Sequence, residues 1–114
     1  MHELSIAQSL MDIIQQEADR HGVERVVRVG VSVGAFSAVV PQALKFSFDM
    51  VKENTVAHQA ELAIREVPLT GRCTECGEEA ELEAPGQDCP ACGAAGMELT
   101  GGRDLTIDYI ETDE

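Results

Sequence analysis

Four cysteines form two close pairs with the spacing of a metal site. The first pair encloses Thr-Glu, the second encloses Pro-Ala, and a glycine follows each pair; the four are Cys73, Cys76, Cys89 and Cys92. Two such turns facing each other can direct four thiolates at one ion, and tetrahedral Zn²⁺ takes sulfur ligands at about 2.3 Å. Because four thiolates leave no open coordination position, the pattern predicts a structural zinc site and not a catalytic one.

Other uses of these cysteines remain open. Two disulfides would suit an oxidising compartment, and a close thiol pair could be redox-active. Similar loops hold iron in rubredoxins, although the aromatic residues that shield such iron are missing from this segment. A rubredoxin-like electron carrier and a zinc-ribbon adaptor protein are therefore the alternative functions.

The N-terminus has a second set of potential metal donors. Met1, His2 and Glu3 bring together an α-amine, an imidazole, backbone amides and a carboxylate. Nitrogen-rich, nearly planar donor sets suit Ni(II) or Cu(II), and part of the α-amine is unprotonated at neutral pH because its pKa is about 7.7–8.0. The positive end of a helix beginning here opposes a cation, so we expect reversible binding.

The charge of the chain limits its partners. With 21 acidic and 8 basic residues its formal charge is −13, which repels nucleic acid and anionic membranes. The segment between Cys73 and Cys92 contains no Lys or Arg and six acidic residues, Glu75, Glu78, Glu79, Glu81, Glu83 and Asp88. We expect no nucleic-acid or membrane partner.

The sequence also indicates where the protein works and argues against catalysis. No apolar run approaches the roughly 18 residues of a membrane span, and the N-terminus lacks the pattern of a secretory signal. We therefore expect a cytoplasmic protein. No catalytic triad, phosphate loop or carboxylate pair stands out, so we expect no enzyme activity.

Hydrophobic periodicity predicts the elements that position these residues. Apolar residues at helical spacing predict one helix that ends near Gly22 and a shorter one that begins at Pro41, with Met11 and Met50 as core-filling residues. Alternating residues predict half-buried strands. The helices are expected at about 4–21 and 41–52, and the strands at 27–33, 60–65 and 105–109.

The cysteine-rich segment is unlike the rest of the chain. Residues 69–102 contain few large apolar side chains, and so short a segment cannot normally fold without a covalent or metal cross-link. We predict an α+β fold with a small sheet of about three strands packed with two helices, and an inserted zinc-ribbon-like module. The domains would be residues 1–68 with 103–114, and residues 69–102.

Taken together, these motifs resemble the HypA/HybF family of hydrogenase maturation nickel metallochaperones. The resemblance covers nearly the whole chain and depends on the combination of a cysteine quartet with an N-terminal Met-His-Glu. The motifs are Met1-His2-Glu3-Leu4-Ser5-Ile6, Gly34-Ala35-Phe36-Ser37, Val39, Pro41, the two cysteine pairs, Gly102-Arg103-Asp104-Leu105-Thr106-Ile107 and Ile110-Glu111.

The resemblance implies a cytoplasmic accessory protein that binds Ni(II) transiently and delivers it to the large subunit of a [NiFe] hydrogenase, together with a nickel-handling GTPase. It implies that residues 1–68 with 103–114 are the nickel-binding domain. His2 would be the essential ligand, helped by the amine of Met1 and the backbone or side chain of Glu3. This chain has Gln42 after the proline where members often have a carboxylate, and it has His58 in a loop where they usually have an acidic residue.

Overall fold

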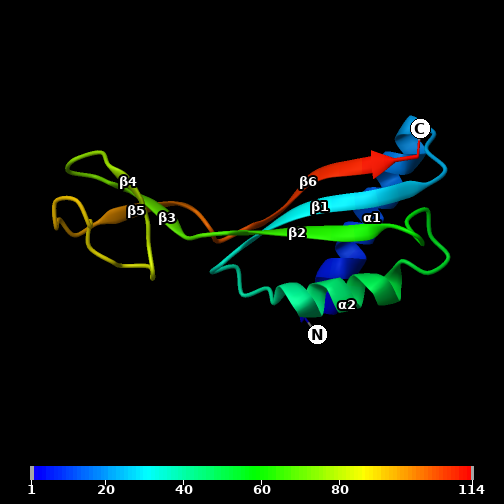
Figure 1. The fold of residues 1–114 in the computed structure, drawn as a ribbon, viewed down its shortest axis with the longest axis horizontal. Helices are drawn as coiled ribbons and strands as arrows, with labels where there is room; N and C mark the ends of the chain where they lie inside the picture. Colours follow the sequence, from blue (N-terminus) through cyan, green and yellow to red (C-terminus); the bar gives the residue numbers. More distant parts are fainter. Residues whose placement is uncertain (1, 114) are drawn as a thin grey trace.

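The computed structural model describes residues 2–113, except for the side chain of His2. The described part of the chain contains two helices and six strands (Figure 1). They are α1 (His2–His21), β1 (Val26–Gly34), α2 (Pro41–Val51), β2 (Glu61–Val67), β3 (Thr70–Cys73), β4 (Glu79–Glu81), β5 (Met97–Gly101) and β6 (Leu105–Thr112). Within these residues no helix is both long and apolar enough to cross a membrane.

Both predicted helices are present. Helix α1 buries Ala7, Leu10 and Ile14 along one stripe and ends before Gly22, whose φ of 67° lies in the left-handed region that favours glycine. Helix α2 begins at Pro41, because a first helical residue does not need its N–H. The predicted boundaries are thus confirmed to within a few residues.

The first sheet has the strand order β2-β1-β6. Strand β1 pairs in parallel with β2 and antiparallel with β6. We predicted a half-buried β1, but the structure buries both of its faces over most of its length. On the face away from the core, the Tyr109 ring lies against Gly30, and the Arg65 side chain donates hydrogen bonds to the hydroxyl of Ser32.

The two helices and the first sheet share one core. Buried residues of α1, β1, α2 and β2 form a single hydrophobic cluster that includes Ile14, Val29 and Phe48. Met11 is buried there as predicted, but the prediction for Met50 was wrong because its side chain is 56% exposed. The buried face of α2 is formed by Leu44, Ser47 and Phe48, so Met50 turns to the other face.

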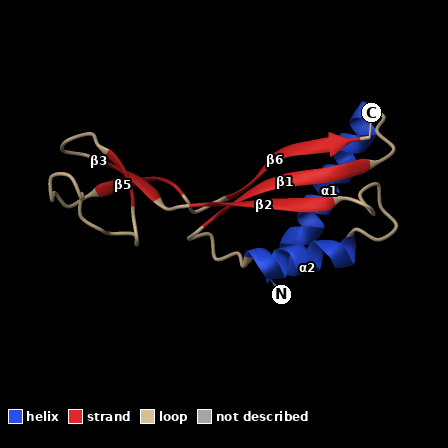
Figure 2. Ribbon diagram, viewed as in Figure 1, coloured by secondary structure: helices blue, strands red, loops and turns tan. Residues whose placement is uncertain are grey.

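The second sheet lies at the other end of an elongated molecule (Figures 1 and 2). Its order is β4-β3-β5, with both pairings antiparallel, which confirms the predicted inserted module. The molecule measures 53 × 29 × 16 Å and its radius of gyration is 17.4 Å. A compact chain of this length would have a radius of about 13 Å, so the two sheets do not form one globule.

Three chain segments meet where the two sheets join. The N–H groups of Gly34 and Phe36 donate to the carbonyls of Asp104 and Gly102, at 2.9 and 2.8 Å. The N–H of Ala35, between them, donates to the carbonyl of Val67 at 2.8 Å. We call this set of backbone bonds the junction. A side chain at Gly34 would collide with the backbone of Gly102, so the segments can approach only because glycine is present.

Candidate metal centre

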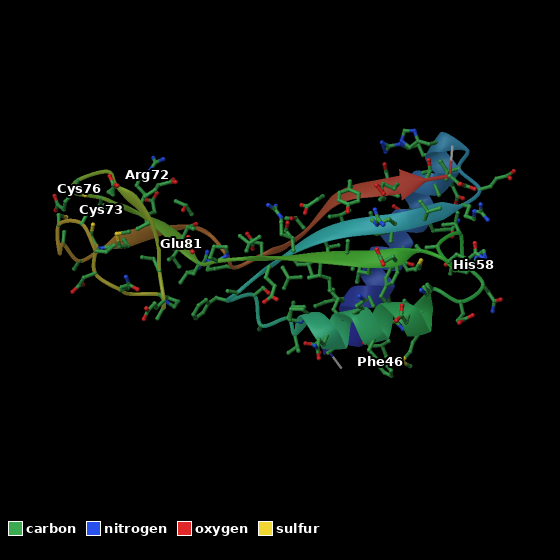
Figure 3. The ribbon with its side chains drawn as sticks, viewed as in Figure 1. Phe46, His58, Arg72, Cys73, Cys76 and Glu81 are labelled. Atoms are coloured by element: carbon green, nitrogen blue, oxygen red, sulfur yellow. The ribbon has the colours of Figure 1, made fainter. Side chains whose placement is uncertain are left out.

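The first cysteine pair lies in a tight turn after β3. The N–H of Gly77 donates to the carbonyl of Cys73 at 3.0 Å, and the N–H of Cys73 donates to the carbonyl of Glu78 at 2.9 Å. Gly77 has a φ of 77°, which explains the glycine directly after the second cysteine of the pair. Figure 3 shows Cys73 and Cys76 at the outer end of the second sheet.

The second pair repeats this turn before β5. The N–H of Gly93 donates to the carbonyl of Cys89 at 2.8 Å, and the N–H of Cys89 donates to the carbonyl of Ala94 at 2.9 Å. Gly93 has a φ of 79°. Two equivalent loops therefore present their sulfurs to a common point.

The geometry of the four sulfurs fits one tetrahedral ion. All lie within 4.8 Å of one another. The Sγ atoms of Cys73 and Cys92 are 3.6 Å apart, and those of Cys76 and Cys89 are 3.8 Å apart. Four ligands at 2.3 Å around zinc would be about 3.8 Å apart, whereas a disulfide needs about 2.05 Å. The structure thus brings together all four predicted cysteines, in an arrangement compatible with structural zinc.

Backbone N–H groups point at the sulfurs and favour their charged form. The N–H groups of Cys76 and Glu75 donate to the sulfur of Cys73 at 3.4 and 3.3 Å, which lowers the pKa of Cys73 to about 6. The N–H of Ala94 favours the thiolate of Cys92, but the neighbouring Cys73 sulfur and desolvation outweigh it and raise the pKa of Cys92 to about 12. The four sulfurs are too close together to be negatively charged at the same time unless a cation lies among them.

No second ligand cluster accompanies this quartet in the described residues. Among residues 2–113 other than the side chain of His2, no other group of three or more His, Cys, Asp or Glu side chains converges enough to share an ion. His58 is exposed in a turn, with Nδ1 3.1 Å from the carbonyl of Thr55 (Figure 3). His21 lies 3.7 Å from Glu17 at the end of α1, about 30 Å along the helix from its start.

The predicted N-terminal site is described only at Glu3. Met1 and the side chain of His2 lie outside the described residues, whereas a Glu3 carboxylate oxygen accepts a hydrogen bond from the N–H of Val40 at 3.1 Å. Val40 is the N-cap of α2 and has no side-chain capping bond of its own. Glu3 therefore links the first turn of α1 to the start of α2, a contact missing from the sequence-based interpretation.

Comparisons with known proteins identify the same family over nearly the whole chain. Residues 1–112 match the family described as "Hydrogenase/urease nickel incorporation, metallochaperone, hypA". The hydrogenase maturation factor HypA of Geobacter metallireducens is 39% identical over 99% of this chain and 100% of its own. HypA of Geotalea daltonii is 41% identical over 94% of each chain, and HybF of Klebsiella pneumoniae is 40% identical over 97% of this chain and 98% of its own.

Two solved structures share the fold. The solution structure of the nickel metallochaperone HypA from Helicobacter pylori has a TM-score of 0.70 and 22% identity, covering 96% of each chain. A second solution structure of a HypA protein has a TM-score of 0.77 and 24% identity, covering 98% of this chain and 96% of its own.

Proposed function

The chain belongs to the HypA family of hydrogenase maturation nickel metallochaperones, and on that premise we propose that it binds Ni(II) at its N-terminus and delivers it for assembly of a [NiFe] hydrogenase. The curated relatives reported above are all named hydrogenase maturation factors, which favours a hydrogenase over a urease as the recipient. The observation that carries the proposal is the family match over residues 1–112, which includes Met1, His2 and Glu3.

The proposed nickel ligands are the amine of Met1, the imidazole of His2 and the backbone nitrogen of Glu3. A set of nitrogen donors is what Ni(II) accepts in a planar site. For Glu3 the bond to Val40 favours the backbone as the donor, because the carboxylate already holds the start of α2. The side chain would then position the N-terminal turn.

The proposed ion in the cysteine quartet is one structural Zn²⁺, held by Cys73, Cys76, Cys89 and Cys92. Four thiolates close its coordination shell, so the ion supplies folding energy to residues 69–102 and takes no part in transfer. We also propose that these residues form a zinc-binding domain, separate from a nickel-binding domain of residues 1–68 with 103–114. The elongated shape and the two separate sheets support this division.

The proposed partners are a nickel-handling GTPase and the hydrogenase large subunit, in the cytoplasm. A reducing compartment would keep the four sulfurs available as thiolates. The chain would act as a carrier without catalytic activity, since delivery requires an ion that is bound and then released.

Nickel titration tests this function directly. The wild-type chain should bind nickel, with a change in ultraviolet absorption. His2→Ala should bind it at least about tenfold more weakly, because losing a partner that only orients a metal ligand already costs about 10–100-fold in affinity. The variants His21→Ala and His58→Ala are matched controls, because each removes an exposed imidazole: His21 lies at the opposite end of α1, and His58 lies in a turn outside the cysteine cluster. Both should bind nickel like the wild type.

Two results would contradict the proposal. One is unchanged nickel affinity in His2→Ala, or in a chain whose first residue is blocked by an N-terminal extension. The other is iron in the cysteine quartet of the purified protein, which would favour a rubredoxin-like electron carrier. If metal analysis finds one zinc but the titration finds no nickel binding, the chain would be a zinc-ribbon adaptor.

A further inference from the structure

Strand β6 is an uncovered edge of the first sheet. In the order β2-β1-β6 it has a neighbour on one side only, so part of its backbone N–H and C=O groups face outward. Edge strands are commonly protected by Pro, Lys or β-bulges. Strand β6 has the sequence LTIDYIET, with neither Pro nor Lys, and its pairing with β1 has two register shifts. Its eight residues are long enough to pair with another strand.

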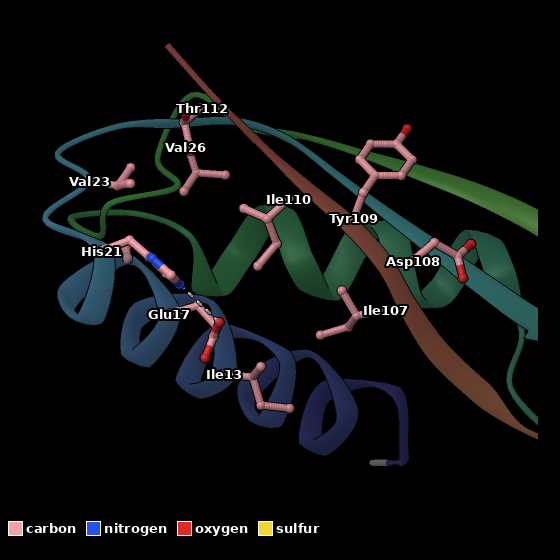
Figure 4. A pocket seen from close by; sticks show the side chains of 11 residues that line it. Ile13, Glu17, His21, Val23, Val26, Ile107, Asp108, Tyr109, Ile110 and Thr112 are labelled. Atoms are coloured by element: carbon pink, nitrogen blue, oxygen red, sulfur yellow. Dashed lines mark ion pairs between the residues drawn. The ribbon is translucent and has the colours of Figure 1, made fainter. Parts of the chain in front are cut away.

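An apolar groove runs beside this edge, between β6 and the C-terminal half of α1 (Figure 4). We call it the edge groove; its volume is about 450 Å³ and its apolar lining includes Ile13, Ala18, Val23, Val26, Ile107 and Ile110. Ile13, on the α1 side, is 46% exposed, although its helical spacing would suit a core position. The groove therefore leaves a large aliphatic side chain without full cover.

The residues of β6 differ between the two faces of the sheet. Ile107 and Ile110 are half-buried and pack against the core, whereas Thr106, Tyr109 and Glu111 are exposed. A strand added alongside would lie about 4.8 Å from β6. Its alternate side chains would enter the edge groove against Ile13, and the others would lie beside the exposed residues.

We propose that the edge groove and β6 bind an extended segment of another protein, which adds a fourth strand to the sheet and alternates apolar with basic residues. Main-chain hydrogen bonds to β6 would give affinity, and the apolar side chains in the groove would give specificity. The described residues that line the groove do not include the proposed nickel donors, so the proposal stands or falls independently of nickel binding.

The charge of this region selects a basic partner. Residues 104–114 contain no Lys or Arg and five acidic residues, Asp104, Asp108, Glu111, Asp113 and Glu114. Three of them, Asp108, Glu111 and Asp113, have ion-pair partners, which are Arg65, Arg28 and Arg25. Such solvent-accessible pairs contribute little, and the carboxylates can still attract further basic groups.

A second copy of this chain is a poorer occupant. Pairing β6 with itself would place acidic strands side by side in chains whose formal charge is −13, and like charges opposite each other are destabilising. The other edge, β2, is also less suitable. The hollow beside it measures only about 190 Å³, and its lining includes Lys45, whereas the charged residues that line the edge groove include the acidic Glu17 and Asp108.

A peptide titration followed by NMR tests the proposal. The probe is a short peptide of alternating valine and lysine, and the control peptide has glutamate in place of lysine. The lysine peptide should shift the amide signals of β6 and the side-chain signals of Ile13, slow amide exchange along β6, and bind more weakly as salt is raised. The glutamate peptide should leave the spectrum unchanged.

Two substitutions give the matched comparison. Ile13→Arg places a cation in the edge groove and should weaken binding of the lysine peptide by about tenfold or more, as expected when a buried aliphatic contact is lost. Phe46→Arg changes a side chain that is 68% exposed on α2 and should leave binding unchanged. The unperturbed spectrum of each variant checks that it remains folded.

Other outcomes overturn the proposal. These are equal binding of both peptides, shifts at β2 in place of β6, or no binding by the lysine peptide. A dimeric wild-type chain in light scattering, with β6 amides protected as concentration rises, would instead assign the edge to a second copy.

Discussion

At the scale of single residues, spacing predicted that the four cysteines converge, but it could not reveal a contact across the fold. The cysteines were identifiable because each pair needs only a local turn and a glycine with positive φ. The bond between Glu3 and the N–H of Val40 joins residues 37 apart in sequence. The local signal for it is weak: Val39-Val40-Pro41 opens α2 without the usual Ser, Thr, Asp or Asn.

Replacing Glu3 tests the importance of this contact. Glu3→Ala removes the acceptor for the N–H of Val40 and should lower the free energy of unfolding by about 1 kcal/mol, as for the loss of a helix cap. Amide exchange at Val40 and in the first turn of α2 should become faster. Glu3→Gln, which keeps an oxygen acceptor, should lie close to the wild type; equal effects of the two substitutions would show that the charge matters and not the bond.

At the scale of elements, periodicity predicted both helices and the strands of the first sheet. It did not predict β3, β4 and β5 individually, because three to five residues give too short a pattern to distinguish a strand from a loop. It also misjudged β1, since the covering of Gly30 by Tyr109 depends on a partner strand far along the chain. The local sequence pattern therefore cannot predict the burial of a strand that is covered by residues far away in the sequence.

The stability of the second sheet should depend on pH and on the metal ion proposed for the cysteine quartet. Cys73 has a pKa of about 6, below the ordinary 9.0, because two backbone N–H groups stabilise its thiolate. A pKa lowered by folding stabilises the fold at high pH, and this contribution is lost as the pH falls through about 6. The raised pKa of Cys92 acts in the opposite direction, because it stabilises the fold at low pH and this contribution is lost only as the pH rises toward about 12. Protons also compete with the ion for all four sulfurs.

We therefore expect acid or a zinc chelator to release the ion and to remove the order of β3, β4 and β5. The NMR signals of these strands should collapse toward unfolded positions, while those of β1 and α1 persist because their core contains none of the cysteines. Loss of both sheets together would contradict this expectation.

At the scale of the whole molecule, the sequence predicted an inserted module but not the hydrogen bonds that attach it to the first sheet. The three-segment junction depends on hydrogen bonds among Gly34–Phe36, Val67 and Gly102–Asp104, and no local pattern encodes these long-range pairings. The parallel pairing of β1 with β2 is equally non-local. The sequence did show that residues 69–102 differ in composition from the rest of the chain, and this difference predicted a separate unit.

Two glycine substitutions test how closely the junction is packed. In Gly34→Ala the new methyl group meets the backbone of Gly102, which cannot rotate away, so we expect a loss of about 1–3 kcal/mol in the free energy of unfolding. In Gly30→Ala the same group meets the ring of Tyr109, a side chain that is 44% exposed and can turn toward solvent. Chemical denaturation should show a smaller loss for Gly30→Ala; the reverse order would mean that the junction tolerates expansion.

The strand order has a consequence for how this protein could be cut and rejoined. Val67 lies opposite Gly34, and Leu105 lies opposite Val33, so β2 leaves the first sheet where β6 enters it, on either side of β1. Two inter-strand spacings amount to about 10 Å. A loop of only a few amino acids could bridge that gap. Residues 69–102 could therefore be cut out and replaced by such a loop, and the strands of the first sheet would keep their order.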